Sequence, residues 1–227
     1  MTDSKYSASG FYDFYPFETS SDYESQLIAN CVSVTSDDYN KLSQPSVSGN
    51  FTVMHLNCER LIPKYGPLQV FLAGLTNLPD VFCLTETWLS EYDKYYPLQH
   101  FNMFNVPRGS RGGGIAFYVN SNYAASVHKL DFCASTFEFA CIQLSLVNSC
   151  LFVLCVYRPP HTDRDIFCNE MTELVSLLPS IHNSLIVCGD YNIDAFKESM
   201  HFNNLVAAHL SVNAYPVIFH PTLVTPT

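Results

Sequence analysis

The sequence predicts an α/β fold in which a mixed sheet and helices are layered around one core, or the related α+β arrangement. Three observations support this prediction: apolar strand-like runs interleave with amphipathic helical segments, several strands follow one another directly, and no internal repeat is visible. The chain has 227 residues, which is enough for one sizeable domain. Its hydrophobic fraction of 48% can supply the core of such a domain.

The first half of the expected domain contains three strands and one helix. The segment "FTVMHLN" alternates apolar and polar residues, which indicates a strand, whereas "PLQVFLAGLTN" repeats its apolar residues at helical spacing. Two further apolar runs indicate strands, and the second of them follows a glycine triplet. The predicted elements are strand 51–57, helix 67–77, strand 79–89 and strand 112–120.

The second half continues with strands and helices of the same kind. Two apolar runs joined by a turn at Asn148 and Ser149 predict a pair of adjacent strands. Thr162 with Asp165 resembles a capping box, which predicts that a helix follows and runs to about Leu178. The predicted elements are strands 137–146, 150–160 and 184–192, and helices 162–178 and 195–210.

The first 50 residues differ from the rest and are predicted to be an unstructured acidic tail, separate from a domain over residues 51–227. They carry seven acidic residues against two lysines, a net charge of −5 out of −10 for the chain. They are rich in Ser, Tyr, Asp and Thr and lack a sustained period. The aromatic stretch "FYDFYPF" at 11–17 leaves a short docking motif as the alternative. The acidic balance argues against a non-specific nucleic-acid binder.

The cysteines and the apolar runs indicate a chain that works inside the cell, in the cytoplasm or nucleus. None of the nine cysteines forms a C-x-x-C pair, so the usual zinc spacing is absent. Those in strand-like runs are expected to be small core residues in a reducing compartment. We find no signal peptide, and the longest apolar run, 150–157, is too short to span a membrane.

Polar side chains stand at the ends of several predicted strands, which predicts a site at one edge of the sheet. Asn57, Glu86 and Tyr157 end three such segments, and "LIVCGDYNID" ends with Asp190 and Asn192. Their carboxylate and amide oxygens are hard ligands that suit Mg²⁺. Because Asp190 and Asn192 are two residues apart, they would face the same side of an extended strand. A turn is the alternative interpretation.

Five motifs in order resemble one family. "HLNCERL", "LTETWL", "RGGGIAFYV", "VYRPP" and "GDYNID" resemble the endonuclease/exonuclease/phosphatase superfamily, and more closely the apurinic-type endonuclease domain of LINE-like, non-LTR retrotransposons. The resemblance covers roughly residues 51–227. It implies a two-sheet, four-layer α/β sandwich, a divalent metal ion (Mg²⁺ or Mn²⁺) and hydrolysis of phosphodiesters in DNA. It also implies a reverse transcriptase in the full element and gives no role to a membrane.

The resemblance assigns a role to each matching residue. Asn57 and Glu86 match residues near the metal and phosphate, and Glu59 matches a further acid near the metal that retrotransposon versions often lack. Tyr157 matches the tyrosine that supports the phosphate. Asp190 matches the aspartate that orients or deprotonates the attacking water, and Asn192 matches the asparagine that holds this aspartate and a phosphate oxygen. Together with water and a metal ion these groups suit phosphodiester cleavage.

The sequence also departs from the family pattern. The family continues past "PTLVTPT" into a strand that carries an aspartate followed by histidine or asparagine, so we expect a truncated domain with weakened catalysis. An inactive relic, or a phosphatase acting on a small substrate, remains the alternative. Arg108, Arg111 and Arg158 are candidate contacts to DNA, with a solvated loop as the other interpretation of the first two. The glycine triplet is expected to allow close backbone approach.

Overall fold

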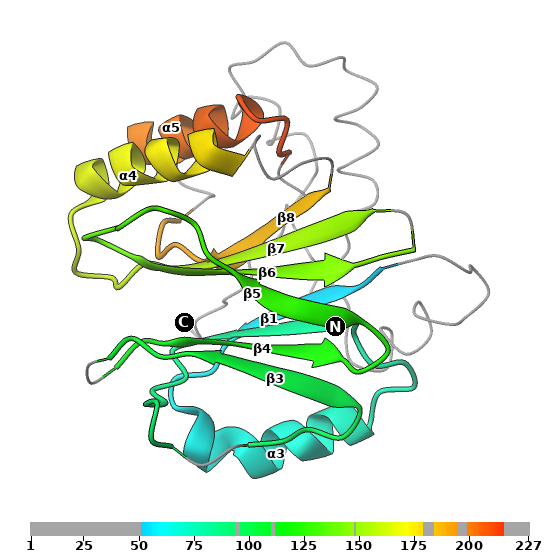
Figure 1. Ribbon diagram of the computed structural model, residues 1–227. Coiled ribbons are helices and arrows are strands. Elements are labelled where there is room, and N and C mark those ends of the chain that lie inside the picture. The colour runs from blue at the N-terminus through cyan, green and yellow to red at the C-terminus, as the bar shows by residue number, and fades with distance from the viewer. Residues whose placement is uncertain are drawn as a thin grey trace, which may run out of the picture.

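The protein folds as two four-stranded sheets packed face to face with helices on both outer faces, as the computed structural model shows (Figure 1). The structure describes residues 51–93, 96–109, 112–147, 149–178, 184–194 and 199–215. The predicted tail, Arg111 and the first residues of the predicted helix 195–210 lie outside these ranges. The two-sheet, four-layer α/β sandwich expected from the resemblance is therefore confirmed.

The first sheet has the strand order β1-β2-β4-β3. Strand β1 runs parallel to β2, and β4 is antiparallel to both β2 and β3. Helix α3 covers its outer face (Figure 1). The bounds are β1 (Val53–Asn57), α3 (Leu61–Ala73), β2 (Val81–Thr85), β3 (Phe101–Val106) and β4 (Ile115–Asn120).

The second sheet has the strand order β5-β6-β7-β8. Strands β5, β6 and β7 form antiparallel pairs, whereas β8 runs parallel to β7. Helices α4 and α5 lie together over its outer face (Figure 1). The bounds are β5 (Ala124–His128), β6 (Glu138–Ser145), β7 (Cys150–Tyr157), α4 (Arg164–Leu177), β8 (Leu185–Asp190) and α5 (Met200–Leu210).

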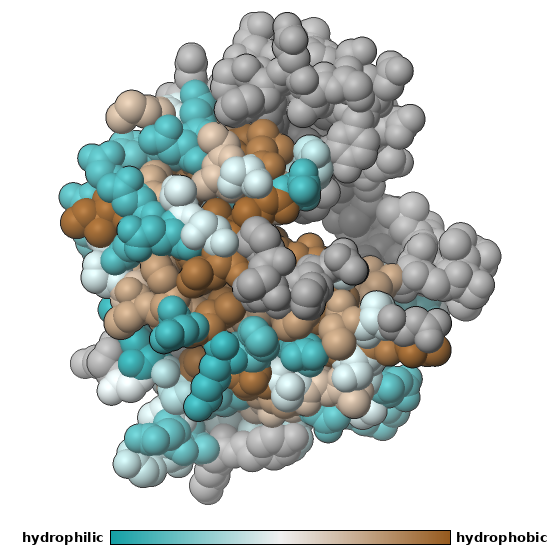
Figure 2. Space-filling view, turned by 45° about the horizontal axis from the view of Figure 1, so that its top comes forward, coloured by the Kyte–Doolittle hydropathy of each residue, from teal (hydrophilic) through white to brown (hydrophobic). Residues whose placement is uncertain are grey.

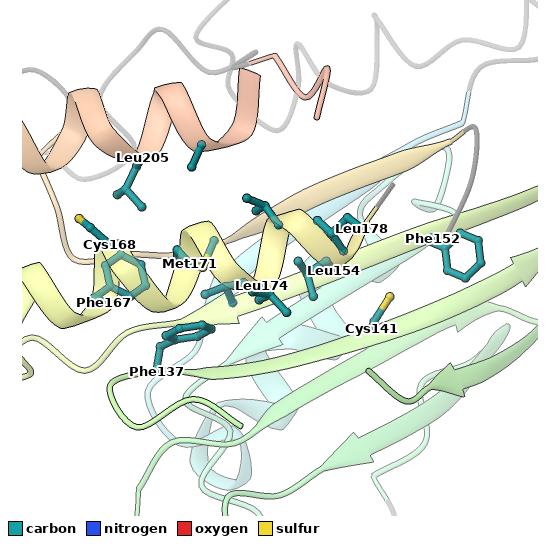
Figure 3. Close-up of a cluster of buried hydrophobic side chains, with 13 residues drawn as sticks. Phe137, Cys141, Phe152, Leu154, Phe167, Cys168, Met171, Leu174, Leu178 and Leu205 are labelled. Carbon is teal, nitrogen blue, oxygen red and sulfur yellow. The ribbon is translucent and has the colours of Figure 1, made fainter. Parts of the chain in front are cut away.

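Three apolar clusters hold the four layers together. The first lies between α3 and its sheet, the second lies between the two sheets, and the third lies between the second sheet and its helices. Figure 3 shows the third cluster, in which Phe137, Met171 and Leu174 fill the space between α4 and the sheet. In the space-filling view hydrophilic residues cover much of the left and lower sides, and hydrophobic residues reach the surface in the centre and in small groups at the edges (Figure 2).

Several predicted boundaries need correction. Helix α3 begins at Leu61 instead of residue 67, because Pro67 lies inside the helix and does not start it. Helix α4 is capped by Asp163, whose side chain accepts hydrogen bonds from the backbone N–H groups of Asp165 and Ile166, so the expected cap at Thr162 is wrong. Strands β3 and β5 were not predicted. Within the described residues no helix is both long and apolar enough to cross a membrane.

Candidate active site

Three of the predicted site residues meet at one edge of the sandwich. The side-chain amide of Asn57 donates to Glu86 Oε1 at 2.7 Å and to Asp190 Oδ2 at 2.8 Å. Asn57 ends β1 and Glu86 follows β2, both in the first sheet, whereas Asp190 ends β8 in the second sheet. One amide therefore joins two carboxylates across the interface between the sheets.

Backbone hydrogen bonds from both neighbouring loops fix the position of Glu86. The N–H of Arg60 donates to the Glu86 carbonyl at 2.8 Å, and the N–H of Trp88 donates to the Gly113 carbonyl at 2.8 Å. Glu86 has a φ of 54°. A non-glycine residue rarely adopts this left-handed conformation, which costs free energy and persists only where its surroundings enforce it. The two loops hold Glu86 in this conformation, in which its carboxylate accepts a hydrogen bond from Asn57.

Tyr157 lies beside the two carboxylates. It ends β7, is the direct partner of Asp190 on β8, and is buried. Burial raises the pKa of Tyr157, and a hydrogen bond with Glu86 raises this pKa further. The phenol therefore keeps its proton at neutral pH and is able to donate a hydrogen bond to an anionic group at this edge.

Asp190 and Asn192 are connected by a turn instead of an extended strand. Strand β8 ends at Asp190, and Asn192 has a φ of 50°. The N–H of Asn192 donates to Asp190 Oδ1 at 3.0 Å, and its side-chain amide donates to the Arg158 carbonyl at 2.7 Å. The expectation that both side chains face the same side of an extended strand is therefore wrong. Asn192 instead fixes the carboxylate of Asp190 through the backbone.

Arg158 does not have the predicted role in nucleic-acid contact. Its exposed fraction is 0%. Its Nε donates to the Tyr191 carbonyl at 2.6 Å, and its guanidinium nitrogens donate to the carbonyls of Asn192 at 2.8 Å and Thr162 at 2.9 Å. Arg158 therefore ties the turn after β8 to the loop after β7, and it is a structural residue beneath the site.

The remaining predicted residues lie around the edge. The side chain of Glu59 is 72% exposed and forms an ion pair with Lys64 at 3.6 Å. Its backbone N–H, however, donates to Asn57 Oδ1 at 3.2 Å and so orients the bridging amide. Arg108 is 41% exposed in its side chain and remains available to a ligand. Arg111 lies outside the described residues.

A third carboxylate, that of Glu138, belongs to the site but was not predicted. Glu138 begins β6 and is the direct partner of Tyr157 on β7. Its Oε2 accepts the N–H of Gly114 at 2.6 Å, and Nε of Arg108 lies 3.4 Å from its Oε1. Burial raises the pKa of Glu138, and the negative charge of Glu86 contributes to this increase. The sequence feature that could have indicated Glu138 is its position as an acidic residue at the start of a strand that pairs in antiparallel fashion.

The glycine triplet allows the close approach that the sequence predicts. Gly113 and Gly114 have φ values of 68° and 87°. A Cβ atom on Gly114 would lie 2.8 Å from the Thr87 hydroxyl oxygen, and one on Gly113 would meet Glu138 even more closely. Glycine at these positions therefore brings the loop before β4 against both the Glu86 loop and Glu138.

The donor set at this edge fits a hard divalent cation. Glu86 and Asp190 present carboxylate oxygens, and the amide nitrogen of Asn57 donates to both and holds them in place. Oε1 of Glu138 is buried and accepts no hydrogen bond from the described residues, and its ion-pair partner is the Arg108 guanidinium, whose Nε lies 3.4 Å away. A buried carboxylate oxygen without a hydrogen bond is costly unless a cation or water satisfies it. These oxygen ligands match the preferences of Mg²⁺ and Mn²⁺.

A groove of about 370 Å³ opens beside this edge. Its walls include Arg108 and Glu138 from the site, Pro159 and Thr162 from the loop after β7, and the segment 132–137 before β6. The groove therefore reaches Glu138 from the surface, and one of its walls carries a partly exposed cation, Arg108.

Comparisons with known proteins agree with this architecture. The profile of the Endonuclease/Exonuclease/phosphatase family matches residues 54–212. The endonuclease domain of TRAS1, a telomere-specific non-LTR retrotransposon, aligns with a TM-score of 0.54 at 12% identity, covering 72% of this chain and 71% of that chain. No curated protein sequence matches the chain.

Two further solved structures share the fold. The 3′-5′ exonuclease NExo from Neisseria meningitidis aligns with a TM-score of 0.53 at 17% identity, covering 71% of each chain. The human Nocturnin catalytic domain aligns with a TM-score of 0.52 at 16% identity, covering 73% of this chain and 76% of that chain. Because the matched profile covers well over half of the sequence and both sheets agree, the chain belongs to the endonuclease/exonuclease/phosphatase family.

Proposed function

We propose that this protein is a metal-dependent phosphodiesterase that nicks DNA, in the manner of the endonuclease domains of non-LTR retrotransposons. The observation that carries the proposal is the Asn57 amide, which holds the carboxylates of Glu86 and Asp190 at 2.7 and 2.8 Å beside a protonated Tyr157. Two positioned carboxylates and a hydroxyl donor form a set that suits attack of water on a phosphodiester.

In this proposal Asp190 acts on the attacking water. Its two oxygens already accept hydrogen bonds from Asn57 and from the Asn192 backbone, which leaves their remaining lone pairs for a water molecule. Asp190 takes a proton from the water as the water oxygen bonds to phosphorus. The bond from phosphorus to one sugar oxygen then breaks, and that oxygen leaves with a proton from solvent. A positioned general base of this kind contributes about 10²–10⁴-fold to the rate.

Glu86 and Glu138 would hold the divalent cation that enzymes of this family generally use, and Asn57 would position Glu86 through its amide nitrogen. When bound, the cation neutralises charge on the phosphoryl oxygens. Tyr157 would turn its hydroxyl from Glu86 to donate a hydrogen bond to one of these oxygens, because its raised pKa keeps it protonated at neutral pH. Tyr157 thereby stabilises the charge that develops in the transition state.

DNA is the substrate that the surroundings favour. The groove beside the site could hold an extended ligand against Glu138, and Arg108 lies on its wall. The protein has a net charge of −10, so a bound phosphate backbone requires local cations, and Arg108 provides one of them. A solved relative, a variant of the 3′ phosphatase NExo from Neisseria, is bound to a product DNA hairpin.

The test is nicking of supercoiled plasmid by the full chain with Mg²⁺ or Mn²⁺. We expect nicking that EDTA abolishes and that D190N and E86Q each reduce by at least about 100-fold. The matched control is E173Q, which removes an exposed carboxylate on α4 and should nick at the wild-type rate.

Two outcomes would overturn the proposal. Wild-type protein that releases phosphate from mononucleotides but does not nick plasmid would be a small-substrate phosphatase. Nicking that survives D190N unchanged would remove Asp190 from the reaction and point to a contaminating nuclease.

A further inference from the structure

The core between the two sheets is built in levels, because alternate residues of four strands face it. Direct pairing places residues of β1 and β2 at matching heights, and the same holds for β7 and β8. The top level, at the candidate active site, contains Asn57, Thr85, Tyr157 and Asp190. The next level contains His55, Cys83, Cys155 and Cys188, and the third contains Val53, Val81, Val153 and Ile186.

The second level brings three thiols together. The sulfur atoms of Cys83, Cys155 and Cys188 all lie within 4.8 Å of one another. Cys83 comes from the first sheet, and Cys155 and Cys188 come from two strands of the second sheet. All three belong to or pack against the cluster between the sheets. The spacing of the cysteines along the sequence does not indicate this group, because sheet packing brings together residues that are far apart in the chain.

The spacing of these thiols suits a tetrahedral metal ion. Zinc binds cysteine sulfur at about 2.3 Å, so two sulfurs on one zinc ion lie ~3.8 Å apart. Sulfurs within 4.8 Å of one another reach that distance by shifts of at most about 1 Å, which side-chain rotation supplies. His55 at the same level is the direct partner of Cys83, but its Nε2 forms a hydrogen bond with the Thr85 hydroxyl at 3.2 Å, so the proposed ligand set is the three thiols alone.

We propose that Cys83, Cys155 and Cys188 bind one Zn²⁺ ion, which ties the two sheets together directly below the candidate active site. The ion would enter from the side of β8, because this strand is outermost among the described strands of its sheet and all six of its residues are partly exposed. Thiolates are soft ligands and the carboxylates above them are hard, so the two sites select different cations.

The alternative interpretation is that these cysteines only fill the core. Another buried cysteine, Cys141, provides a control that distinguishes this interpretation from a zinc site. Cys141 is also buried, but it faces α4 in the outer cluster, away from the other three thiols (Figure 3). If core filling were the whole role, C141A and C155A would behave alike. If the three thiols form a zinc site, only C155A removes a ligand.

The experiment uses the full chain, reduced, stripped of metal and titrated with Co²⁺ and then Zn²⁺. In wild type and C141A we expect a near-ultraviolet thiolate-to-cobalt charge-transfer band that saturates at one Co²⁺ per chain and disappears when Zn²⁺ displaces it. C155A should lose the band. Zinc should raise the melting temperature of wild type and C141A by several degrees and leave that of C155A unchanged.

The wild-type spectrum keeps the proposal falsifiable even if C155A does not fold. Absence of a saturable thiolate band in folded wild type would overturn the site. Retention of the full band in folded C155A would assign it to other cysteines and would equally overturn the proposal. Nicking activity is not a readout in this experiment, so its result is independent of the proposed function.

Discussion

Gly113 lies so close to Glu138 that a Cβ atom on this glycine would overlap Oε1 of the glutamate. Glycine at this position therefore sets the position of the Glu138 carboxylate, and with it one wall of the candidate active site.

Replacing Gly113 by alanine should consequently affect both stability and activity. Alanine at a φ of 68° costs about 1–2 kcal/mol of conformational free energy. The clash with Glu138 adds to this cost and breaks the hydrogen bond from Gly114, worth about 1 kcal/mol. The control is G109A, which has a φ of 77° but nothing within 4 Å of the added Cβ. Equal unfolding free energies for G113A and G109A in denaturant titrations would refute the close contact.

The carboxylate of Glu138 should make stability fall as pH rises. Burial raises its pKa in the folded protein, so the folded state holds this proton more tightly than the unfolded state. The protonated Glu138 therefore contributes its full stabilisation at pH values below the ordinary pKa of glutamate. This contribution is lost as the pH rises through the raised pKa of Glu138 in the folded protein. E138Q lacks this dependence, so its melting temperature should increase relative to wild type from acidic to neutral pH. Melts in EDTA at several pH values test this, and parallel curves would contradict it.

Loss of Arg158 should destabilise the fold instead of weakening DNA binding. R158A leaves the carbonyls of Tyr191, Asn192 and Thr162 without their donor, which we expect to cost more than about 3 kcal/mol. R164A, an exposed arginine at the start of α4, should change the unfolding free energy by less than about 0.5 kcal/mol. Denaturant titration of both variants gives the answer. A stable R158A with weakened DNA affinity would restore the role in DNA contact that burial argues against.

Arg108 should contribute to the salt dependence of DNA binding. A single lost phosphate contact reduces the slope of log affinity against log salt by about 1. We expect this reduction for R108A, whereas R108K should keep the slope because it keeps the charge. Binding measured in EDTA over a range of salt concentrations tests the difference. If R108A keeps the full slope, Arg108 only neutralises Glu138.

The sequence predicts the residues at the strand ends of the site, but it does not predict Glu138, which lies beside them. Asn57, Glu86, Tyr157 and Asp190 stand at strand ends, and strand ends meet at one edge of a sheet, so their convergence follows from the pattern. Glu138 was missed because it begins its strand. Only the antiparallel pairing with β7, which the sequence does not specify, brings it beside Tyr157.

The errors in the predicted elements have similar physical causes. Strand β3 has partly exposed residues at most positions and β5 has no buried residue, so neither shows the continuous apolar run of a buried strand. Pro67 favours a helix start when the sequence is considered alone, yet packing of the α3 residues against the first sheet extends the helix beyond it. Arg158 looks like a surface cation until three loop carbonyls surround it.

The hydrogen bond between Asn57 and Asp190 joins residues that are 133 positions apart in the chain. Contacts of such long sequence separation form late in folding, since the entropy of closing the loop must be overcome first. The two sheets can each gain their own strand pairing before this amide reaches its second carboxylate. Recovery of the proposed nicking activity during refolding should therefore lag behind recovery of secondary structure, and the site would serve as an indicator that the two halves of the sandwich have docked.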